Sequence, residues 1–342
     1  MTDRTFRHYR VGLRRLIKLL GKDHPRLGEA LVLQHRLLEN LADAEARGST
    51  AELEMSRARI LESCNRLCHA LLDESFYTLC GLPASARQKA GVGSAESAAR
   101  PALDAYYDVM NALLQDESLR APIAATEARQ RARAETLQIL QTLDGIQKGH
   151  VVQFLYEAGL ITEGPGVLFL SEADLSDAHL QGTFLIEAHL AGTDLRHAHL
   201  DAAHLEWSRL GEARMVGTSL KHAFLVAAHL ARAQLQEARL DHARLLGANL
   251  AGANLTGARM DHAQMQWASF VTTNFQGASL VDAQLMGAEL TSSNLADADF
   301  SGANLKGVHL RGARLRGVKY DARTRWPVGF DPIAAKAIKI DA

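Results

Sequence analysis

The sequence predicts two parts, an N-terminal helical bundle and an all-β rod built from a short repeat. From Leu170 to Tyr320, every fifth residue is large and apolar at 31 consecutive positions, without one insertion. Residues 1–82 instead place apolar side chains three and four positions apart, which is the spacing of one helix face. The 342-residue chain has 47% hydrophobic and 23% charged residues, a composition typical of folded domains.

A period of five fits neither a helix nor a flat strand. Five helical residues turn the chain by about 500°, so the repeated leucines would spread around every face. Five is also odd, so in a strand successive leucines would alternate between the two faces. The chain must therefore turn once per repeat. A small residue stands two positions before each large one, is Ala at 22 of 30 positions, and would share its inward side.

The repeat also has a recognisable form. Glycine follows the large residue by two positions in 12 of 30 repeats, where a corner would need a positive φ. The stretches Ala248-Asn249-Leu250-Ala251-Gly252 and Ala253-Asn254-Leu255-Thr256-Gly257 resemble the pentapeptide-repeat family. This resemblance implies a right-handed quadrilateral β-helix over residues 168–320, with four repeats per coil. The interior would then include Leu205, Leu225, Leu245, Leu250 and Leu255.

Both ends of the rod are expected to be covered. Residues 321–342 resemble the C-terminal end of such rods, where Trp326 and Phe330 would cover the last coil. Residues 101–163 are expected to form helices at about 101–118 and 124–143 and an N-terminal cap. Its last part, Leu143–Ile161, resembles a segment found before pentapeptide rods. There Val151, Phe154, Leu155 and Leu160 would plug the first coil.

The N-terminal residues 1–83 are expected to form a helical interaction domain, joined by a linker over residues 84–100. The capping box Ser49-Thr50-Ala51-Glu52 would open a third helix. The stretches LVLQHRLLENLADAEARGSTAELEMSRARILE and NRLCHALLDESFYTLCGLP resemble effector-associated helical domains of bacterial STAND and conflict systems. The resemblance implies an adaptor module that binds helical partners.

Charge and cysteine content exclude several classes of protein. With 38 basic and 39 acidic residues the chain is nearly neutral, which argues against a general nucleic-acid binder. Three cysteines in a long chain do not indicate a disulfide framework. The chain lacks an 18-residue apolar stretch and a signal peptide, so a cytoplasmic location is expected. The basic face of the first helix would contact anionic lipid or nucleic acid, or only solvent; it carries Arg7, Arg10, Arg14, Arg15 and Lys18.

No enzyme motif or cofactor fingerprint is evident, so the sequence predicts neither catalytic residues nor a cofactor. With four repeats per coil, His222, His242 and His262 would form one column, with Asp241 and Asp261 beside it and Asp282 continuing it. Side chains that emerge in parallel from a wall do not converge as a zinc site requires, so a hydrated ladder is expected rather than a metal site. Cys64 and Cys68, next to His69, lack a second pair of ligands and are expected to pack in a core.

One of the four faces of the predicted rod is apolar on the outside. Its outward and corner residues are Phe184, Ile186, Trp207, Phe224, Val226, Leu246, Trp267 and Met286. An exposed patch of this kind indicates that something covers it. The sequence leaves open whether the cover is the protein's own helices, a second subunit in a homodimer, or another protein.

These features predict a non-enzymatic protein–protein interaction scaffold or adaptor in a bacterial conflict or signalling system, with no small-molecule substrate. The alternative is a DNA-mimicking modulator of DNA gyrase or topoisomerase, as for other pentapeptide proteins. Mimicry requires an acidic rod, whereas residues 171–320 hold 13 basic and 15 acidic residues. Binding to nucleic acid or to a membrane is not expected.

Overall fold

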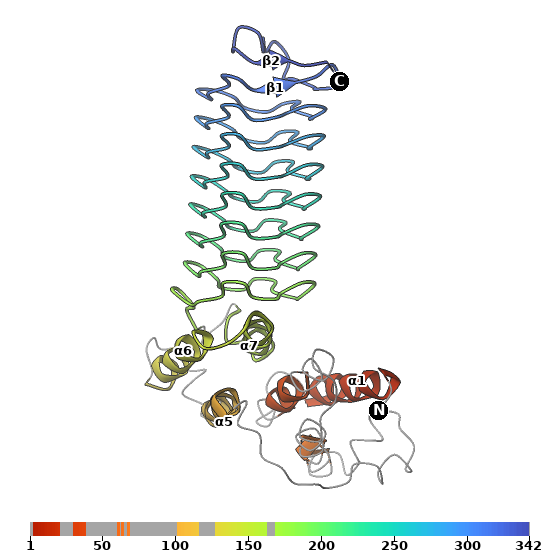
Figure 1. The fold of residues 1–342 in the computed structure, drawn as a ribbon, viewed down its shortest axis with the longest axis vertical. Coiled ribbons are helices and arrows are strands. Elements are labelled where there is room, and N and C mark those ends of the chain that lie inside the picture. Colours follow the sequence, from red (N-terminus) through yellow and green to blue (C-terminus); the bar gives the residue numbers. More distant parts are fainter. Residues whose placement is uncertain are drawn as a thin grey trace. The chain divides into compact units, whose positions relative to one another are not determined.

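A computed structural model describes residues 3–20, 30–38, 60, 61, 63, 64, 67, 68, 101–115, 127–162 and 168–341. The chain divides into two compact units (Figure 1). The helical unit comprises Met1–Ile139 with His150–Ala158, and the repeat unit comprises Leu140–Gly149 with Gly159–Ala342. The predicted capping box at residues 49–52 and the linker at 84–100 lie outside the described residues. Among the helices that are described, none has the length and apolar character needed to cross a membrane.

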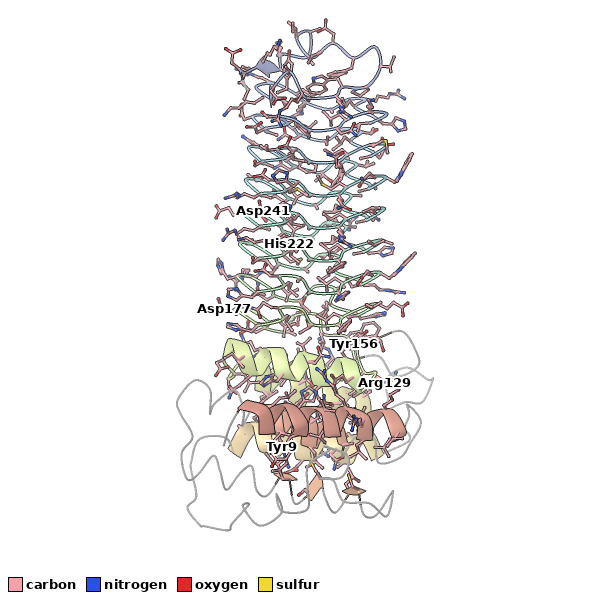
Figure 2. All side chains as sticks on the ribbon, turned by 90° about the vertical axis from the view of Figure 1, so that its right-hand side faces the viewer. Tyr9, Arg129, Tyr156, Asp177, His222 and Asp241 are labelled. Atoms are coloured by element: carbon pink, nitrogen blue, oxygen red, sulfur yellow. The ribbon has the colours of Figure 1, made fainter. Side chains whose placement is uncertain are left out.

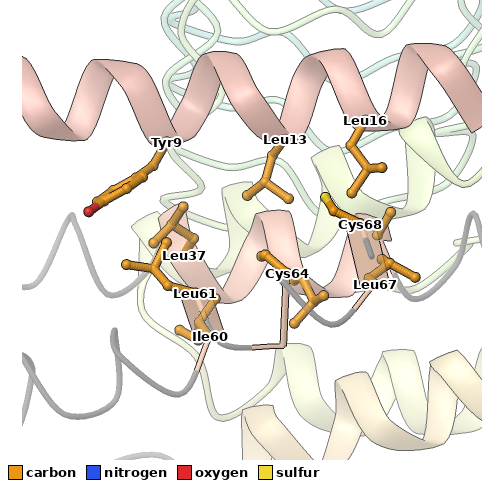
Figure 3. Packing of buried hydrophobic residues seen from close by; sticks show 11 residues of the cluster. Tyr9, Leu13, Leu16, Leu37, Ile60, Leu61, Cys64, Leu67 and Cys68 are labelled. Carbon is orange, nitrogen blue, oxygen red and sulfur yellow. The ribbon is translucent and has the colours of Figure 1, made fainter. Parts of the chain in front are cut away.

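The described residues include the helices α1 (Asp3–Leu20), α5 (Pro101–Gln115), α6 (Glu127–Leu140) and α7 (Gly145–Glu157); residues 30–38 are helical as well. Helix α1 is amphipathic, and Tyr9, Leu13 and Leu16 are buried along one side while Arg14 and Arg15 are exposed. The buried side packs into a cluster, drawn in Figure 3, that includes Leu37, Ile60, Leu61, Cys64, Leu67 and Cys68. Both cysteines thus lie in a hydrophobic core.

The repeat unit is a stack of coils that pair through parallel β-bridges. Each bridge joins a residue to the one 20 positions later, from Asp174↔Asp194 to Asp299↔Lys319. Each coil therefore contains four five-residue repeats. Every repeat holds one turn, in which, for example, the Ala173 N–H donates to the Leu170 carbonyl at 2.9 Å.

The corners explain the glycines of the repeat. Every residue that follows a large residue by two positions, from Glu172 to Gly317, has φ between 55° and 79°. A four-residue turn with positive φ only at its third residue is of type II, which favours glycine there. Glycine fills 12 of these corners and other residues fill 18, including Trp207 and Trp267.

The interior follows the spacing of the sequence. All of the large residues of the repeat are buried except Leu310, which is half-buried. Leu205, Leu225, Leu245, Leu250 and Leu255 are fully buried. The small inward positions that carry a hydroxyl satisfy it with backbone carbonyls; Thr193 Oγ1 donates to the Leu190 carbonyl at 2.7 Å. The core is therefore apolar or internally hydrogen-bonded throughout.

The first turn of α7 covers one edge of the first coil. The carbonyl of Gly145 accepts a hydrogen bond from the His179 N–H at 2.8 Å. Lys148, which is buried, donates from Nζ to the Ser176 carbonyl at 3.1 Å and lies 3.1 Å from Asp174 Oδ2. These contacts satisfy groups that an open sheet edge would leave unpaired.

Three of the four residues expected to plug the first coil belong to the helical unit instead. Val151, Phe154 and Leu155 are buried and belong to the helical unit, where Phe154 packs edge-on against Tyr107 with ring centroids 5.3 Å apart. Leu160 belongs to the repeat unit and is buried. Gly145, Lys148 and Gly149 contact the first coil instead.

The C-terminal segment adds a strand to the last coil. Strand β1 (Lys319–Tyr320) pairs in parallel with β2 (Ile338–Lys339). The Trp326 ring lies 5.6 Å from Tyr320 and 5.0 Å from Phe330, measured between centroids. This arrangement places Trp326 beside the last large residue of the repeat and Phe330 beside Trp326. Their capping role remains a prediction.

The regular register of the coils ends at Asp321. Asn304 pairs with Arg325, one position beyond the partner that the regular spacing gives, so one extra residue enters the last coil. The Asp321 carboxylate, which is buried, accepts hydrogen bonds from the backbone N–H groups of Gly302 at 2.8 Å, Arg323 at 3.0 Å and Thr324 at 3.0 Å. Asp321 therefore stabilises the turn that absorbs the insertion.

We expect this end of the repeat unit to loosen in acid because of Asp321. Burial by itself raises the pKa of this carboxyl group, but hydrogen bonds from Gly302, Thr324 and Arg323 outweigh burial and lower the pKa to about 2. Since the folded pKa is below the unfolded value of about 4, the stabilisation is complete above that value and disappears as the pH falls towards 2.

Tryptophan fluorescence can measure this effect. In a Trp207→Phe/Trp267→Phe background, Trp326 is the one remaining tryptophan. We expect its emission to report solvent exposure between about pH 4 and pH 2, and the Asp321→Asn variant to lose this step because an amide does not titrate in that range. An identical acid transition in both proteins would show that Asp321 is not responsible.

Candidate interaction surface

The apolar face consists of the eight residues predicted from the repeat: Phe184, Ile186, Trp207, Phe224, Val226, Leu246, Trp267 and Met286. They flank buried residues of one column, from Leu185 to Leu285, which hold the backbone in place. Trp267 is 69% exposed, Trp207 58% and Phe184 54%, and Met286 is also exposed. The other four side chains are half-buried. Large apolar groups thus reach the surface on consecutive coils.

A ladder of stacked rings stiffens this face. The rings of Phe184 and His204 stack with centroids 4.6 Å apart, and those of His204 and Phe224 with centroids 4.4 Å apart. The Arg244 guanidinium lies 4.8 Å from the centre of the Phe224 ring. Sequence reasoning singled out the two phenylalanines and missed His204 and Arg244. The sequence did contain an indication: His204 and Arg244 each lie 20 residues, or one coil, from a phenylalanine of the face, and residues one coil apart are bridged side by side.

The two tryptophans occupy strained corners. Trp207 has φ 60° and Trp267 has φ 61°, in a region that bulky residues rarely adopt. The Trp267 ring lies directly over Gly287, where an added Cβ would overlap it. Trp207 and Trp267 are three coils apart, which is about 14 Å along the stack. Sixteen other non-glycine corners share this conformation, so the size and exposure of the two indole rings distinguish these positions.

The predicted histidine column is a parallel stack. The rings of His222, His242 and His262 lie 4.9 and 4.8 Å apart, with interplanar angles of 6° and 9°. Figure 2 shows His222 and Asp241 on the coils, and the His222 N–H donates to the Asp241 carbonyl. Parallel rings do not converge on one point, as a tetrahedral metal site requires. Within the described part of the chain, no three potential ligands are grouped to hold a metal.

The acidic residues near this column pair with arginines. Arg259 lies 3.6 Å from the carboxylates of both Asp241 and Asp261. Arg323 Nη1 donates to Asp282 Oδ1 at 2.9 Å. These pairs distribute both signs of charge over the same surface.

Asp194, on another face of the stack, is also paired with arginines. Its carboxylate accepts hydrogen bonds from Arg196 Nη2 at 2.7 Å and lies 3.3 Å from Arg214 Nη1. Burial raises the pKa of Asp194, but the two arginines outweigh it and lower the pKa. Charges of the repeat unit are therefore neutralised locally.

The helical unit contains a partly buried polar pair that the sequence did not reveal. His35 is fully buried, and its Nε2 lies 3.3 Å from Glu157 Oε2. Burial raises the pKa of Glu157, but hydrogen bonds with His35 and Gln153 lower it overall. The pair links residues 30–38 to the end of α7. A histidine inside the apolar run LVLQHRLL was the indication in the sequence.

Comparison with known proteins identifies the repeat. A family model described as "Pentapeptide repeats" matches in eight copies over residues 170–206, 208–245, 233–270, 268–307 and 283–319. Pentapeptide-repeat proteins are generally non-enzymatic structural or interaction scaffolds. A search of curated proteins finds no match to the chain.

Three solved structures illustrate the range of similar proteins. HetL, a pentapeptide repeat protein involved in heterocyst differentiation regulation in the cyanobacterium Nostoc sp. strain PCC 7120, is 29% identical, with 44% of this chain and 81% of that chain covered and a TM-score of 0.20. AT2G44920 from the Arabidopsis thaliana thylakoid lumen is 29% identical, with coverages of 26% and 61% and a TM-score of 0.25. QnrB1, a plasmid-mediated fluoroquinolone resistance protein, is 18% identical, with coverages of 44% and 80% and a TM-score of 0.26.

Proposed function

We propose that this protein is a non-enzymatic interaction scaffold whose repeat unit presents the apolar face to a protein partner. The observation that carries the proposal is the pair of exposed tryptophans, Trp207 and Trp267, at positive-φ corners. Tryptophan is enriched among residues that dominate binding energy at interfaces. Both rings are largely exposed and so contribute little to folding stability, which makes binding the better explanation.

The rigidity of the face supports the same function. Its coils are hydrogen-bonded on both sides; the Leu205 N–H donates to the Phe224 carbonyl at 2.8 Å, and the Leu225 N–H donates to the Arg244 carbonyl at 2.7 Å. A surface that is already ordered loses little conformational entropy on binding. The stacked ladder of Phe184, His204 and Phe224 would act as a preformed platform.

The proposal extends to the architecture and the helical unit. We propose a right-handed, quadrilateral rod, supported by the regular pairing of successive coils with four turns in each. We also propose that the helical half is an adaptor in a bacterial conflict or signalling system and that the protein is cytoplasmic. The adaptor role is supported by the resemblance of residues 31–83 to effector-associated domains.

Modulation of DNA gyrase is the competing function. A protein that mimics DNA must present a strongly acidic surface, whereas acidic residues here pair with arginines, as Asp194 does with Arg196 and Arg214. We therefore favour a partner that binds apolar surface. Recovery of gyrase subunits with the purified protein would reverse this choice.

Replacing both tryptophans tests the scaffold function. We expect Trp207→Glu/Trp267→Glu to reduce recovery of bound proteins by at least about tenfold, because two carboxylates would be buried in an apolar interface. The melting temperature should change little, since both side chains are exposed. Quantitative mass spectrometry of proteins co-purified with the intact chain provides the measurement.

His222→Glu/His262→Glu is the matched control, because it alters two positive-φ corners of another column. It should leave the recovered proteins unchanged. If the helical half covers the apolar face, the tryptophan variant should instead increase protease cleavage within residues 84–100. Unchanged association, proteolysis and stability in the tryptophan variant would show that the face has no such role.

A further inference from the structure

We propose that the apolar face binds a second copy of this chain, packed antiparallel against the same face across a two-fold axis. This inference rests on the proposed scaffold function and specifies its partner. It follows from the order of residues along three columns of the face, in which projecting groups and open positions have the same spacing.

The corner column supplies the projections and the openings. On successive coils, this column consists of Trp207, Ala227, Gly247, Trp267, Gly287 and Gly307. The tryptophan pair and the pair Gly247 and Gly307 are each separated by three coils, or about 14 Å along the stack. A Cβ added at Gly247 would meet no atom within 4 Å, and one at Gly307 would meet only the Gly287 nitrogen, at 3.9 Å. Two projections therefore match two open positions.

A two-fold axis that runs across the face at right angles to the stack places each column opposite itself in reverse order. An axis midway between the coils of Gly247 and Trp267 sets Trp267 against Gly247 of the second copy. It also sets Trp207 against Gly307 of the second copy. Each tryptophan corner thus faces a glycine corner of the second copy, and the contact is closed because both copies use the same surface. The Trp267 ring, which lies over Gly287, meets the small residues Gly247 and Ala227 of the second copy.

The outward column is complementary under the same axis. Glu206 lies opposite Lys306 of the second copy, and Val226 lies opposite Met286. The Glu206 Oε1 atom is 3.2 Å from His204 Nδ1, while its Oε2 atom is buried and has no hydrogen-bond partner among the described residues. The side chain as a whole is 22% exposed, so a lysine from a second copy would face its exposed part and supply an opposite charge.

Neighbouring registers are less favourable. The charged residues in the three columns from His204 to Gly307 are Glu206, Arg244 and Lys306. Moving the axis half a coil towards the N-terminus puts Arg244 opposite itself, which brings like charges together. Moving it by one whole coil puts Trp207 opposite Trp267 and leaves both glycines unfilled. The proposed register avoids both conflicts.

The size of the contact sets the expected affinity. From Glu206 to Lys306 it spans six coils, about 24 Å between the first and the last. The flat area of one face of this length is roughly 300 Å² per partner, which is below the roughly 800 Å² per partner of a standard interface. The association should therefore be weak and depend on concentration.

Sedimentation equilibrium of the full chain from about 1 to about 300 μM tests the proposal. We expect a monomer–dimer equilibrium in the natural protein. Glu206→Lys and Lys306→Glu should each weaken it at least about tenfold, because each sets like charges opposite one another. The double variant Glu206→Lys/Lys306→Glu should restore the dimer, because the charges are exchanged between the two sites.

Filling an opening provides a second test. Gly247→Trp should weaken the dimer, since it places two indole rings in the same space. Gly277→Trp is the matched control, because Gly277 also has positive φ and open surroundings but belongs to another column. Gly277→Trp should leave the dimer unchanged, and its melting temperature should equal that of Gly247→Trp.

A chain that stays monomeric throughout, or a charge exchange that fails to restore association, would overturn the proposal. Assemblies larger than a dimer would indicate head-to-tail contacts and would overturn the two-fold arrangement. A monomer that still recovers another protein through Trp207 and Trp267 would overturn self-association and leave the scaffold function intact. Dimers that also bind no other protein would support self-association alone.

Discussion

The variant Leu250→Asp is expected to prevent the protein from accumulating in a soluble folded form. Leu250 is fully buried in the middle of the stack, and its neighbours in the same interior column, Leu230 and Phe270, are also fully buried and apolar. A carboxylate there would have neither water nor a hydrogen-bond donor, which is prohibitive for a charged group. Each coil contacts only its neighbours, so the defect would divide the stack into two shorter parts with exposed ends.

The milder change Leu250→Ala gives a measurable stability difference. We expect it to lower the free energy of unfolding by about 2–5 kcal/mol, through lost burial and the cavity that remains. Chemical denaturation followed by circular dichroism provides the measurement. Ala251→Asp is the control, because this neighbouring position faces outward and should change the stability by less than about 0.5 kcal/mol. A soluble Leu250→Asp protein with a normal melting curve would contradict the inward placement of the leucines.

The interior and the apolar face could be predicted from sequence because the repeat fixes the position of every residue. Once each coil holds four repeats of constant length, the face of a side chain follows from its number alone. Phe184 and Phe224 could therefore be assigned to one column, and Trp207 and Trp267 to one corner. The positive φ of the corners could likewise be inferred from the frequency of glycine, since no other residue adopts it without cost.

The ends of the repeat unit could not be predicted in the same way. The five-residue phase stops at Tyr320, so the extra residue at Asp321 and the pairing of β1 with β2 depend on three-dimensional contacts. His35 and Glu157 are 122 residues apart in sequence, and no local pattern relates them. In α7, apolar residues suggested the plug, whereas the contact with the first coil is made by Gly145, Lys148 and Gly149. Close approach of two backbones favours residues without a side chain, which a hydrophobic pattern does not reveal.

These glycines lead to an expected result opposite to the usual helix rule. Gly145 and Gly149 are four residues apart and therefore lie on one side of α7. A Cβ added at Gly149 would overlap the carbonyl oxygen of His179, a backbone atom. That backbone is held by the hydrogen bond from the His179 N–H to the Gly145 carbonyl and cannot yield without breaking the cap. The added methyl group must therefore separate the helix from the coil.

We expect Gly149→Ala to destabilise the first coil, although alanine in place of glycine stabilises an ordinary helix interior by about 1 kcal/mol. Overpacking costs about 1–3 kcal/mol, more than the gain in helix propensity. Hydrogen exchange should show faster exchange of the His179 amide, which donates to the Gly145 carbonyl, while coils around Leu250 keep their protection. Ile146→Ala, at an exposed position on the same turn, should leave these rates nearly unchanged. Slower exchange at His179 in Gly149→Ala would mean that propensity outweighs packing and that α7 does not press on the first coil as the structure shows.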